Sequence, residues 1–322
     1  MIGGMFLDGY AHAYVIDTAT EDFFTPWHGV FYAGFTVLAA WIGLVGYRRR
    51  RPGVGVLDWF PAAYRPAVLG LVIFAIGGVG DGIWHTVFGV EVGIDALLSP
   101  THLVLFAGSV LLLWTPVRAS AARADRSPWL AVGAATLTTA LLVFLTQYLW
   151  LVPHPWYAQQ FFDPDSGAGS DMVQLFLGSA MVSAAVLVGP LRLVARHWTL
   201  PFGAAAVAWG VAAALEALAF SQEAWVVPVA VVAGLVHDVV LRSFGSLRAG
   251  AMAAAFAGPA ALFALYLVVA RLDGPLGWPP EIWGGLVVMA GGVGLAIVLL
   301  EGSGPASRDA VGQPAGSLTP PG

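Results

Sequence analysis

Residues 67–88 read AVLGLVIFAIGGVGDGIWHTVF, and this stretch decides the fold class of the chain. It carries one charged residue, Asp81, among apolar side chains and glycines. As a helix rising about 1.5 Å per residue, it is long enough to cross a hydrocarbon core of roughly 30 Å. The stretch therefore predicts a transmembrane helix with an acid and a histidine, His85, near one end.

The rest of the chain repeats this apolar pattern. Of its 322 residues, 58% are hydrophobic and 10% are charged, and the mean hydropathy is +0.80, values far from those of a soluble domain. We expect residues 1–301 to form one all-α domain, a polytopic transmembrane helical bundle of nine spans. The predicted spans cover residues 29–47, 67–88, 101–117, 129–150, 172–191, 200–220, 226–242, 249–271 and 282–300. Residues 302–322 are rich in Gly, Pro and Ser and lack apolar periodicity, which predicts a disordered tail.

The distribution of basic residues predicts the orientation. All 14 are arginines, and alternating the nine spans from an outside N-terminus places every one except Arg271 in the cytoplasm. We therefore expect a multi-pass protein of the cell membrane with its N-terminus outside and its C-terminal tail in the cytoplasm. The lipid bilayer is its expected partner, while the net charge of −5 and the absence of a basic surface exclude nucleic acid. Additional subunits or a homo-oligomer remain open.

One motif, Asp-Gly-x-x-His followed by Thr/Ser-Pro-x-His, occurs twice, in residues 8–34 and 81–108. Its ligand-type residues are Asp8, His12 and His28 in the first copy and Asp81, His85 and His102 in the second. If each Asp-Gly-x-x-His segment is helical, its Asp and His share one helix face. Thr25 and Ser99 are typical helix N-caps, and Pro26 and Pro100 typical first helical residues, so the last His of each copy is expected in an opening turn.

Two imidazoles and one carboxylate with open positions form the ligand set of non-haem Fe(II), and the same set suits Cu(II) or Zn. The chain has no Cys, which excludes thiolate sites and iron–sulfur clusters. We therefore expect the six residues to bind one or two metal ions near the outer membrane face. A metal-free polar network is the alternative. Glu91 and Asp95, between His85 and His102, are the next candidate ligands and are otherwise solvated loop acids.

The first copy resembles a known family. The segment from His12 through Asp17-Thr18 to Phe24-Thr25-Pro26-Trp27-His28, with the apolar pair Phe31-Tyr32, resembles the C subunit of the copper membrane monooxygenases, the particulate methane and ammonia monooxygenases. In that family, Asp-x-x-x-His precedes Asp-Thr-x-Phe-Thr-Pro-x-His, and the Asp and two His bind a metal near the outer side of the membrane. The resemblance covers residues 8–32 and implies that Asp8, His12 and His28 are ligands.

The resemblance further implies a copper-dependent oxidoreductase, a monooxygenase-like subunit that oxidises a small apolar substrate, with iron or zinc as the alternative metals. The residues alone leave two other functions open. One is a membrane transporter or metal-handling protein without redox catalysis, in which Glu216, His237 and Asp238 are stepping points through the bilayer. The other is a haem protein ligated by two of the outer histidines. No catalytic residue is indicated by sequence.

Overall fold

The computed structural model describes residues 1–15, 23–91, 93–123, 127–150, 167–220, 223–244 and 246–301. The tail predicted to be disordered and the Asp17-Thr18 part of the resemblance lie outside these ranges. Within them the chain is helical and contains no strand, which confirms the all-α prediction.

The described helices follow one another along the chain with short connections. They are α1 (Ile2–Tyr14), α2 (Pro26–Arg49), the 3-10 helices η1 (Val56–Trp59) and η2 (Ala62–Tyr64), α3 (Arg65–Phe88), α4 (Ile94–Leu98), α5 (Pro100–Leu113), α6 (Thr115–Ala121), α7 (Pro128–Leu145), the 3-10 helix η3 (Gln147–Leu149), α9 (Gly167–Ala195), α10 (Ala204–Ala219), α11 (Val226–Arg242), α12 (Leu247–Asp273) and α13 (Pro280–Leu300).

Seven helical stretches in the described part of the chain are long and apolar enough to cross a membrane, as expected of a multi-pass membrane protein. They match seven of the nine predicted spans and cover Pro26–Arg49, Ala62–Phe88, Pro100–Ala121, Pro128–Leu145, Val173–Ala195, Leu247–Asp273 and Pro280–Leu300. The two other predicted spans, 200–220 and 226–242, correspond to α10 and α11. These helices have 16 and 17 residues. At 1.5 Å per residue they are about 24–26 Å long, shorter than the hydrocarbon core.

The predicted span 101–117 is divided into α5 and α6. Pro116 lies in the first turn of α6, and a proline cannot donate a backbone hydrogen bond to the preceding turn. The Leu112 carbonyl, four residues before Pro116, instead accepts a hydrogen bond from the Trp114 nitrogen. The adjacent Leu111 carbonyl accepts hydrogen bonds from Arg118 Nη2 at 2.6 Å and from Thr115 Oγ1 at 3.3 Å. The break in the helix therefore leaves both carbonyls satisfied.

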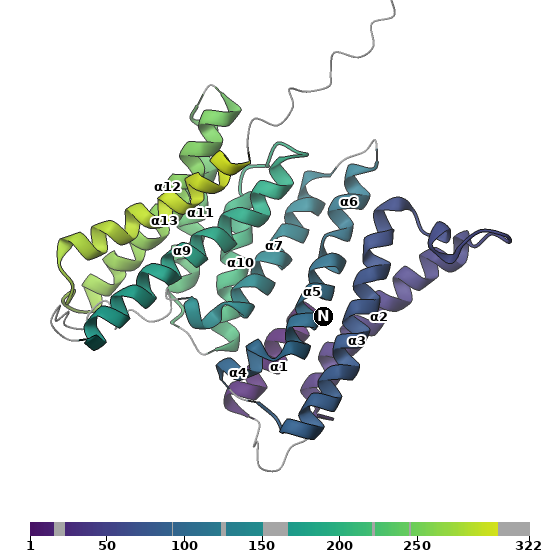
Figure 1. Ribbon diagram of the computed structural model, residues 1–322. Helices are drawn as coiled ribbons and strands as arrows, with labels where there is room; N and C mark the ends of the chain where they lie inside the picture. The colour runs from purple at the N-terminus through teal and green to yellow at the C-terminus, as the bar shows by residue number, and fades with distance from the viewer. Residues whose placement is uncertain are drawn as a thin grey trace, which may run out of the picture.

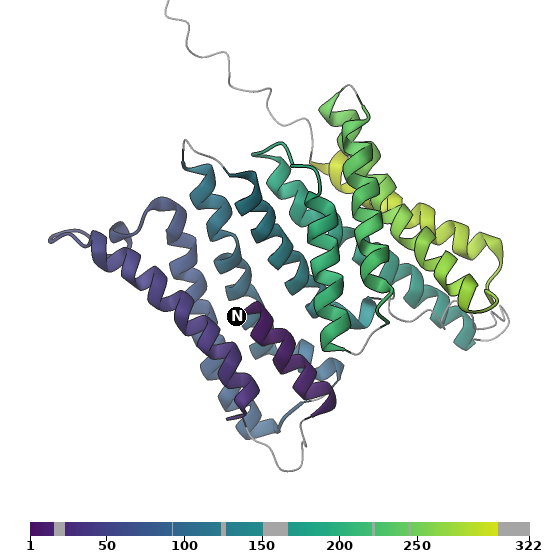
Figure 2. The same cartoon turned by 180° about the vertical axis from the view of Figure 1, so that it is seen from behind.

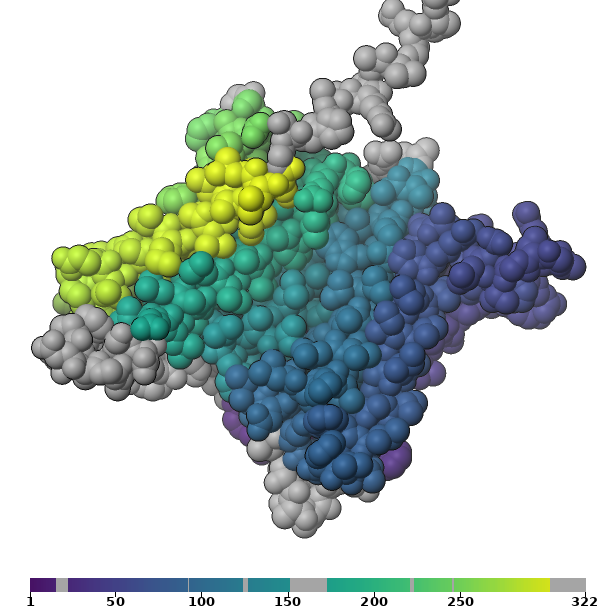
Figure 3. All heavy atoms as spheres, viewed as in Figure 1, coloured from purple at the N-terminus to yellow at the C-terminus, as the bar shows by residue number. Residues whose placement is uncertain are grey.

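The helices lie across the bundle roughly in the order in which they follow one another in the sequence. The α2–α3 pair lies at one side and the α12–α13 pair at the other, with α5, α7, α9 and α10 between them (Figures 1 and 3). Helix α1, which is not among the predicted spans, packs against α2, α7 and α10, as the rear view shows (Figure 2). It begins partway along α2, since a Cβ on Gly34 would lie 2.2 Å from the Met1 nitrogen. The first helix is thus a half-length element inside the bundle.

Glycines set the close approach of the helices that carry the motif. A Cβ on Gly4 of α1 would lie 2.9 Å from the Phe31 Cα of α2, and one on Gly108 of α5 would lie 2.8 Å from the Phe74 nitrogen of α3. A Cβ on Gly77 of α3 would lie 3.0 Å from the Leu105 nitrogen of α5, so this glycine also permits close helix packing. These contacts bring the motif-bearing ends of α1, α2, α3 and α5 together.

Candidate metal centre

The local structure of both motif copies is the one that the sequence predicts. The Asp-Gly-x-x-His segments are helical, in α1 and near the end of α3. Thr25 caps α2 by accepting a hydrogen bond from the His28 nitrogen at 3.2 Å, and Ser99 caps α5 by accepting one from the His102 nitrogen at 3.4 Å. A proline follows each cap. The last His of each copy therefore lies in an opening turn, as predicted.

We call Asp8, His12 and His28 the first triad. Its carboxylate lies between its two imidazoles: Asp8 Oδ2 is 3.6 Å from His28 Nε2 and 4.0 Å from His12 Nε2. The three ligand atoms lie within 4.8 Å of one another. Two donors on one ion at 2.0–2.1 Å are roughly 3–3.4 Å apart, so small inward side-chain movements would complete coordination.

We call Asp81, His85 and His102 the second triad. Asp81 Oδ1 is 3.0 Å from His102 Nε2 and 3.6 Å from His85 Nε2. The compact group of ligand atoms on this side, however, consists of Asp81, His85 and His28, all within 4.8 Å of one another. His28 of the first triad therefore belongs to both groups, whereas His102 contacts Asp81 without joining either.

The two triads form one continuous cluster. The imidazole rings follow one another with centroid distances of 5.3 Å from His12 to His28, 5.8 Å from His28 to His85, and 5.7 Å from His85 to His102. We call all six residues the His/Asp cluster. Neither triad is splayed, and the interface between α1, α2, α3 and α5 brings all six side chains to one end of the bundle (Figure 1).

Three of the four imidazoles share one orientation. Each has Nδ1 against a protein oxygen and Nε2 facing a carboxylate of the cluster. The oxygens are Thr25 Oγ1 for His28 at 3.0 Å, the Gly89 carbonyl for His85 at 3.1 Å, and the Ala96 carbonyl for His102. A carbonyl that accepts from Nδ1–H leaves the Nε2 lone pair free, which is how proteins orient metal-binding histidines.

Several polar atoms of the cluster are buried without a hydrogen-bond partner. They are Asp8 Oδ1, His12 Nδ1 and His85 Nε2. An unpaired buried polar atom costs roughly 1–3 kcal/mol, so such atoms call for a missing partner. His85 Nε2 is the most informative of them, because its lone pair faces Asp81 at 3.6 Å in a residue that is 5% exposed. A cation between these groups would satisfy both.

The electrostatics of α1 favour the same conclusion. Burial raises the pKa of the Asp8 carboxyl to about 7, an effect that the nearby His102 opposes and Asp81 strengthens. Burial also lowers the pKa of the His12 imidazole to about 4. At Asp8 and His12 the protein thus disfavours both a bare carboxylate and an imidazolium, whereas a metal cation would stabilise the carboxylate and bind the neutral imidazole.

Two residues that the sequence analysis did not single out hold Asp81 in place. Tyr32 of α2 donates a hydrogen bond to Asp81 Oδ2 at 3.2 Å, and Thr101 donates one to Asp81 Oδ1 at 3.1 Å. The repeat contains a sequence signal for Tyr32, because the equivalent residue in the second copy is Phe106, which has no hydroxyl. The Tyr32 hydroxyl, present only in the first copy, bonds to Asp81 of the second copy.

The secondary candidates lie outside both compact groups. Glu91 accepts a hydrogen bond from Trp84 Nε1, and Asp95 is exposed in the first turn of α4. Of the two, Glu91 keeps a buried oxygen, Oε2, without a partner. Neither is grouped with other ligand-type side chains among the described residues.

The polar groups of α10 and α11 lie apart from the cluster. The Asp238 carboxylate accepts hydrogen bonds from the backbone nitrogens of Ala205 and Ala206, each at 3.3 Å, and so caps the start of α10 from a neighbouring helix. His237 lies beside it, with Nδ1 3.7 Å from Asp238 Oδ1. Glu216 is fully buried, and neither of its oxygens has a hydrogen-bond partner. Asp238 therefore has a structural role, while Glu216 has none that its contacts explain.

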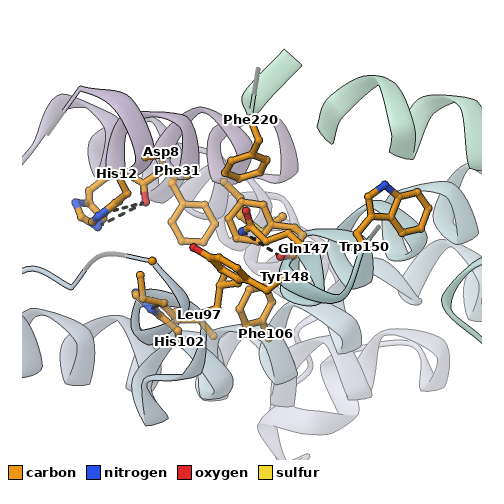
Figure 4. A pocket seen from close by; sticks show the side chains of 18 of the residues that line it. Asp8, His12, Phe31, Leu97, His102, Phe106, Gln147, Tyr148, Trp150 and Phe220 are labelled. Carbon is orange, nitrogen blue, oxygen red and sulfur yellow. Dashed lines mark hydrogen bonds and ion pairs between the residues drawn. The ribbon is translucent and has the colours of Figure 1, made fainter. Parts of the chain in front are cut away.

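A cavity of about 650 Å³ adjoins the cluster. Asp8, His12 and His102 lie at one end and Trp150 at the other, as the close view shows (Figure 4). Aromatic side chains, among them Phe106 of α5 and Phe220 just after α10, form much of the wall between (Figure 4). The cluster therefore faces a space that a small organic molecule can occupy.

A second, apolar groove of about 590 Å³ lies between α2 and α3. Phe23 and Tyr32 separate it from the cluster, since the Phe23 ring stacks on His28 at 5.0 Å and Tyr32 bonds to Asp81. Its outer edge includes Val79 and Ile83, which are exposed on the surface of α3, in the candidate membrane span Ala62–Phe88. No protein-family model, curated protein or solved structure matches this chain significantly.

Proposed function

We propose that this protein is an integral membrane metalloprotein whose His/Asp cluster binds a metal ion. The observation that carries the proposal is the shared orientation of three imidazoles, with Nδ1 held by a protein oxygen and Nε2 facing the two carboxylates. A metal-free polar network would leave His85 Nε2 buried and unpaired, at a cost that a bound cation removes.

We propose that one ion occupies the cluster at a time, bound through His28. Both compact groups of ligand atoms contain His28, and its Nδ1 lies against Thr25, so only Nε2 is free to bind. The first triad and the Asp81–His85 pair then supply alternative donors to the same ion. Two ions, one in each repeat, which the sequence left open, would need His102 to turn toward His85.

Copper is the metal we propose, with iron and zinc as alternatives. Nitrogen and oxygen donors suit all three, and the chain has no Cys to select among them. The resemblance of residues 8–32 to the copper membrane monooxygenases favours copper. A copper ion at this position would supply the redox chemistry with which that family oxidises small apolar molecules using O₂.

The chain's own residues would position the substrate and the ion. Asp8, His12, His28, Asp81 and His85 would hold the ion, while Tyr32 and Thr101 orient Asp81. The cavity places an organic molecule beside them, and the apolar groove between α2 and α3 offers a route from lipid to the Phe23–Tyr32 wall. These features support a monooxygenase-like subunit.

We further propose nine membrane crossings with the N-terminus outside, so that the cluster lies near the extracytoplasmic face. The arginine distribution supports this orientation. α10 and α11 would cross as short helices packed among α7, α9 and α12. The protein would then take its metal from outside the cell membrane.

The direct experiment is metal analysis of purified protein after incubation with Cu(II) and desalting. Wild-type protein should retain one copper per chain, and His28→Ala should retain little. The matched control is His197→Ala, which removes an exposed histidine at the far end of α9. Equal retention by the two variants would overturn the proposal. O₂-dependent hydroxylation of short alkanes or epoxidation of alkenes by copper-loaded protein, with an added quinol as the two-electron donor and absent in His28→Ala, tests the activity.

Metal transport is the second candidate, favoured by the buried and unpartnered Glu216 on α10. Asp238 is a weaker candidate for a step on a transport path, because its carboxylate already caps the start of α10. Copper flux into proteoliposomes that depends on Glu216 would support transport. A fixed copper without flux would support the metalloenzyme, and a haem absorption band would support neither.

A further inference from the structure

The cavity beside the cluster is much larger than a gas molecule. About 650 Å³ equals the liquid volume of roughly 20 water molecules, at about 30 Å³ each. A substrate the size of methane would leave most of that volume to be filled by something else. The size therefore points to an occupant with about 12–20 non-hydrogen atoms.

The cavity wall has a polar position that is not part of the cluster. Gln147 and Tyr148 of η3 line the cavity between the cluster and Trp150 (Figure 4). The Gln147 amide nitrogen donates to the Phe144 carbonyl at 3.3 Å, which leaves its amide oxygen as an acceptor. Tyr148 is 47% exposed and presents a hydroxyl beside it. Together they offer one acceptor and one hydroxyl to a ligand.

The other hydroxyls on this wall are already engaged. Ser109 donates to the Leu105 carbonyl at 2.8 Å, and Tyr14 donates to the Phe220 carbonyl at 2.7 Å. The described lining contains no Arg or Lys, so a ligand carboxylate or phosphate at Gln147 and Tyr148 would find no basic side chain beside it. The occupant that fits is neutral, with an apolar body and one hydroxyl.

We propose that this cavity binds a medium- to long-chain alcohol, with its hydroxyl at Gln147 and Tyr148 and its hydrocarbon end at the His/Asp cluster. The role of this alcohol as a substrate rests on the oxidation proposed above. The binding of the alcohol depends on the cavity alone. A hydrogen bond at one end and aromatic walls along the body fix which carbon faces the metal site.

The test uses the full-length protein in lipid nanodiscs and a diazirine analogue of 1-hexadecanol, with excess 1-hexadecanol as competitor. Saturable labelling is expected on peptides that line the cavity. Leu175→Trp fills the cavity from α9, outside the cluster, and should weaken saturable labelling roughly tenfold or more. Leu193→Trp is the matched control, because it is on the same helix, is 41% exposed against 40% for Leu175, and does not line the cavity.

Gln147→Leu keeps the side-chain size and removes the amide, so it should weaken competition by 1-hexadecanol and leave competition by hexadecane unchanged. Labelling that does not saturate, or that persists equally in Leu175→Trp and Leu193→Trp, would overturn the inference. Copper retention is measured on the same samples. Saturable labelling without copper would refute the metal proposal alone, and copper without saturable labelling would refute the cavity proposal alone.

Discussion

Separate replacement of His28 and His102 by Ala tests whether the two histidines contribute unequally to metal affinity, as the structure indicates. The two histidines occupy equivalent positions in the motif, so the repeat itself gives no reason for their losses of metal affinity to differ. In the structure, His28 belongs to both compact groups of ligand atoms, whereas His102 contacts Asp81 and the Ala96 carbonyl and belongs to neither. The expected losses are therefore unequal.

The magnitudes follow from these contacts. His102 acts as a partner of the Asp81 carboxylate, and loss of such an outer partner typically weakens metal binding about 10–100-fold, or roughly 1.4–2.7 kcal/mol. His28 is a direct donor, and its removal should exceed that range. We expect His28→Ala to lose more than about 100-fold in copper affinity.

The assay is competition with a chromogenic Cu(II) chelator, using detergent-solubilised protein whose helicity is checked by circular dichroism. His28 is 4% exposed, so its replacement also leaves a small cavity, and the folding check is part of the measurement. Equal losses for His28→Ala and His102→Ala would refute the shared-donor arrangement. A larger loss for His102→Ala would refute it more strongly.

Three further outcomes are expected. Tyr32→Phe removes the hydroxyl that orients the second-copy acid and should weaken copper binding about tenfold, while Tyr47→Phe, at the exposed end of α2, should leave copper affinity unchanged in the same chelator assay. Gly108→Ala places a methyl against the α3 backbone and should lower stability by about 1–3 kcal/mol, whereas Gly133→Ala, with open space around it, should be neutral or stabilising in thermal unfolding. Asp238→Ala removes the cap of α10 and should cost about 0.5–2 kcal/mol of stability while copper retention stays at the wild-type level; loss of copper instead would place that residue in the metal path.

The sequence predicted the local structure of the site because each part depends on neighbouring residues. Thr25 and Ser99 cap helices whose first residue is proline, and this geometry is set within one turn. The i,i+4 spacing likewise fixed each Asp beside its His once the segment was helical. The helical fold class followed from apolar length alone.

The parts that depend on packing between distant segments could not be predicted. His28 lies with Asp81 and His85 because α1, α2 and α3 meet, and no local pattern encodes that meeting. The hydrogen bond from Tyr32 to Asp81 has the same origin. The length of α10 also differs from its apolar run, because the helix starts only at Ala204, where Asp238 of α11 caps it.

X-ray absorption at the copper edge of the purified, copper-loaded protein tests the central claim most directly. We predict one copper per chain with nitrogen and oxygen donors at about 2.0–2.1 Å and imidazole scattering that weakens in His28→Ala. Protein that holds no stoichiometric metal, or a spectrum that His28→Ala leaves unchanged, would contradict a metal site at the His/Asp cluster.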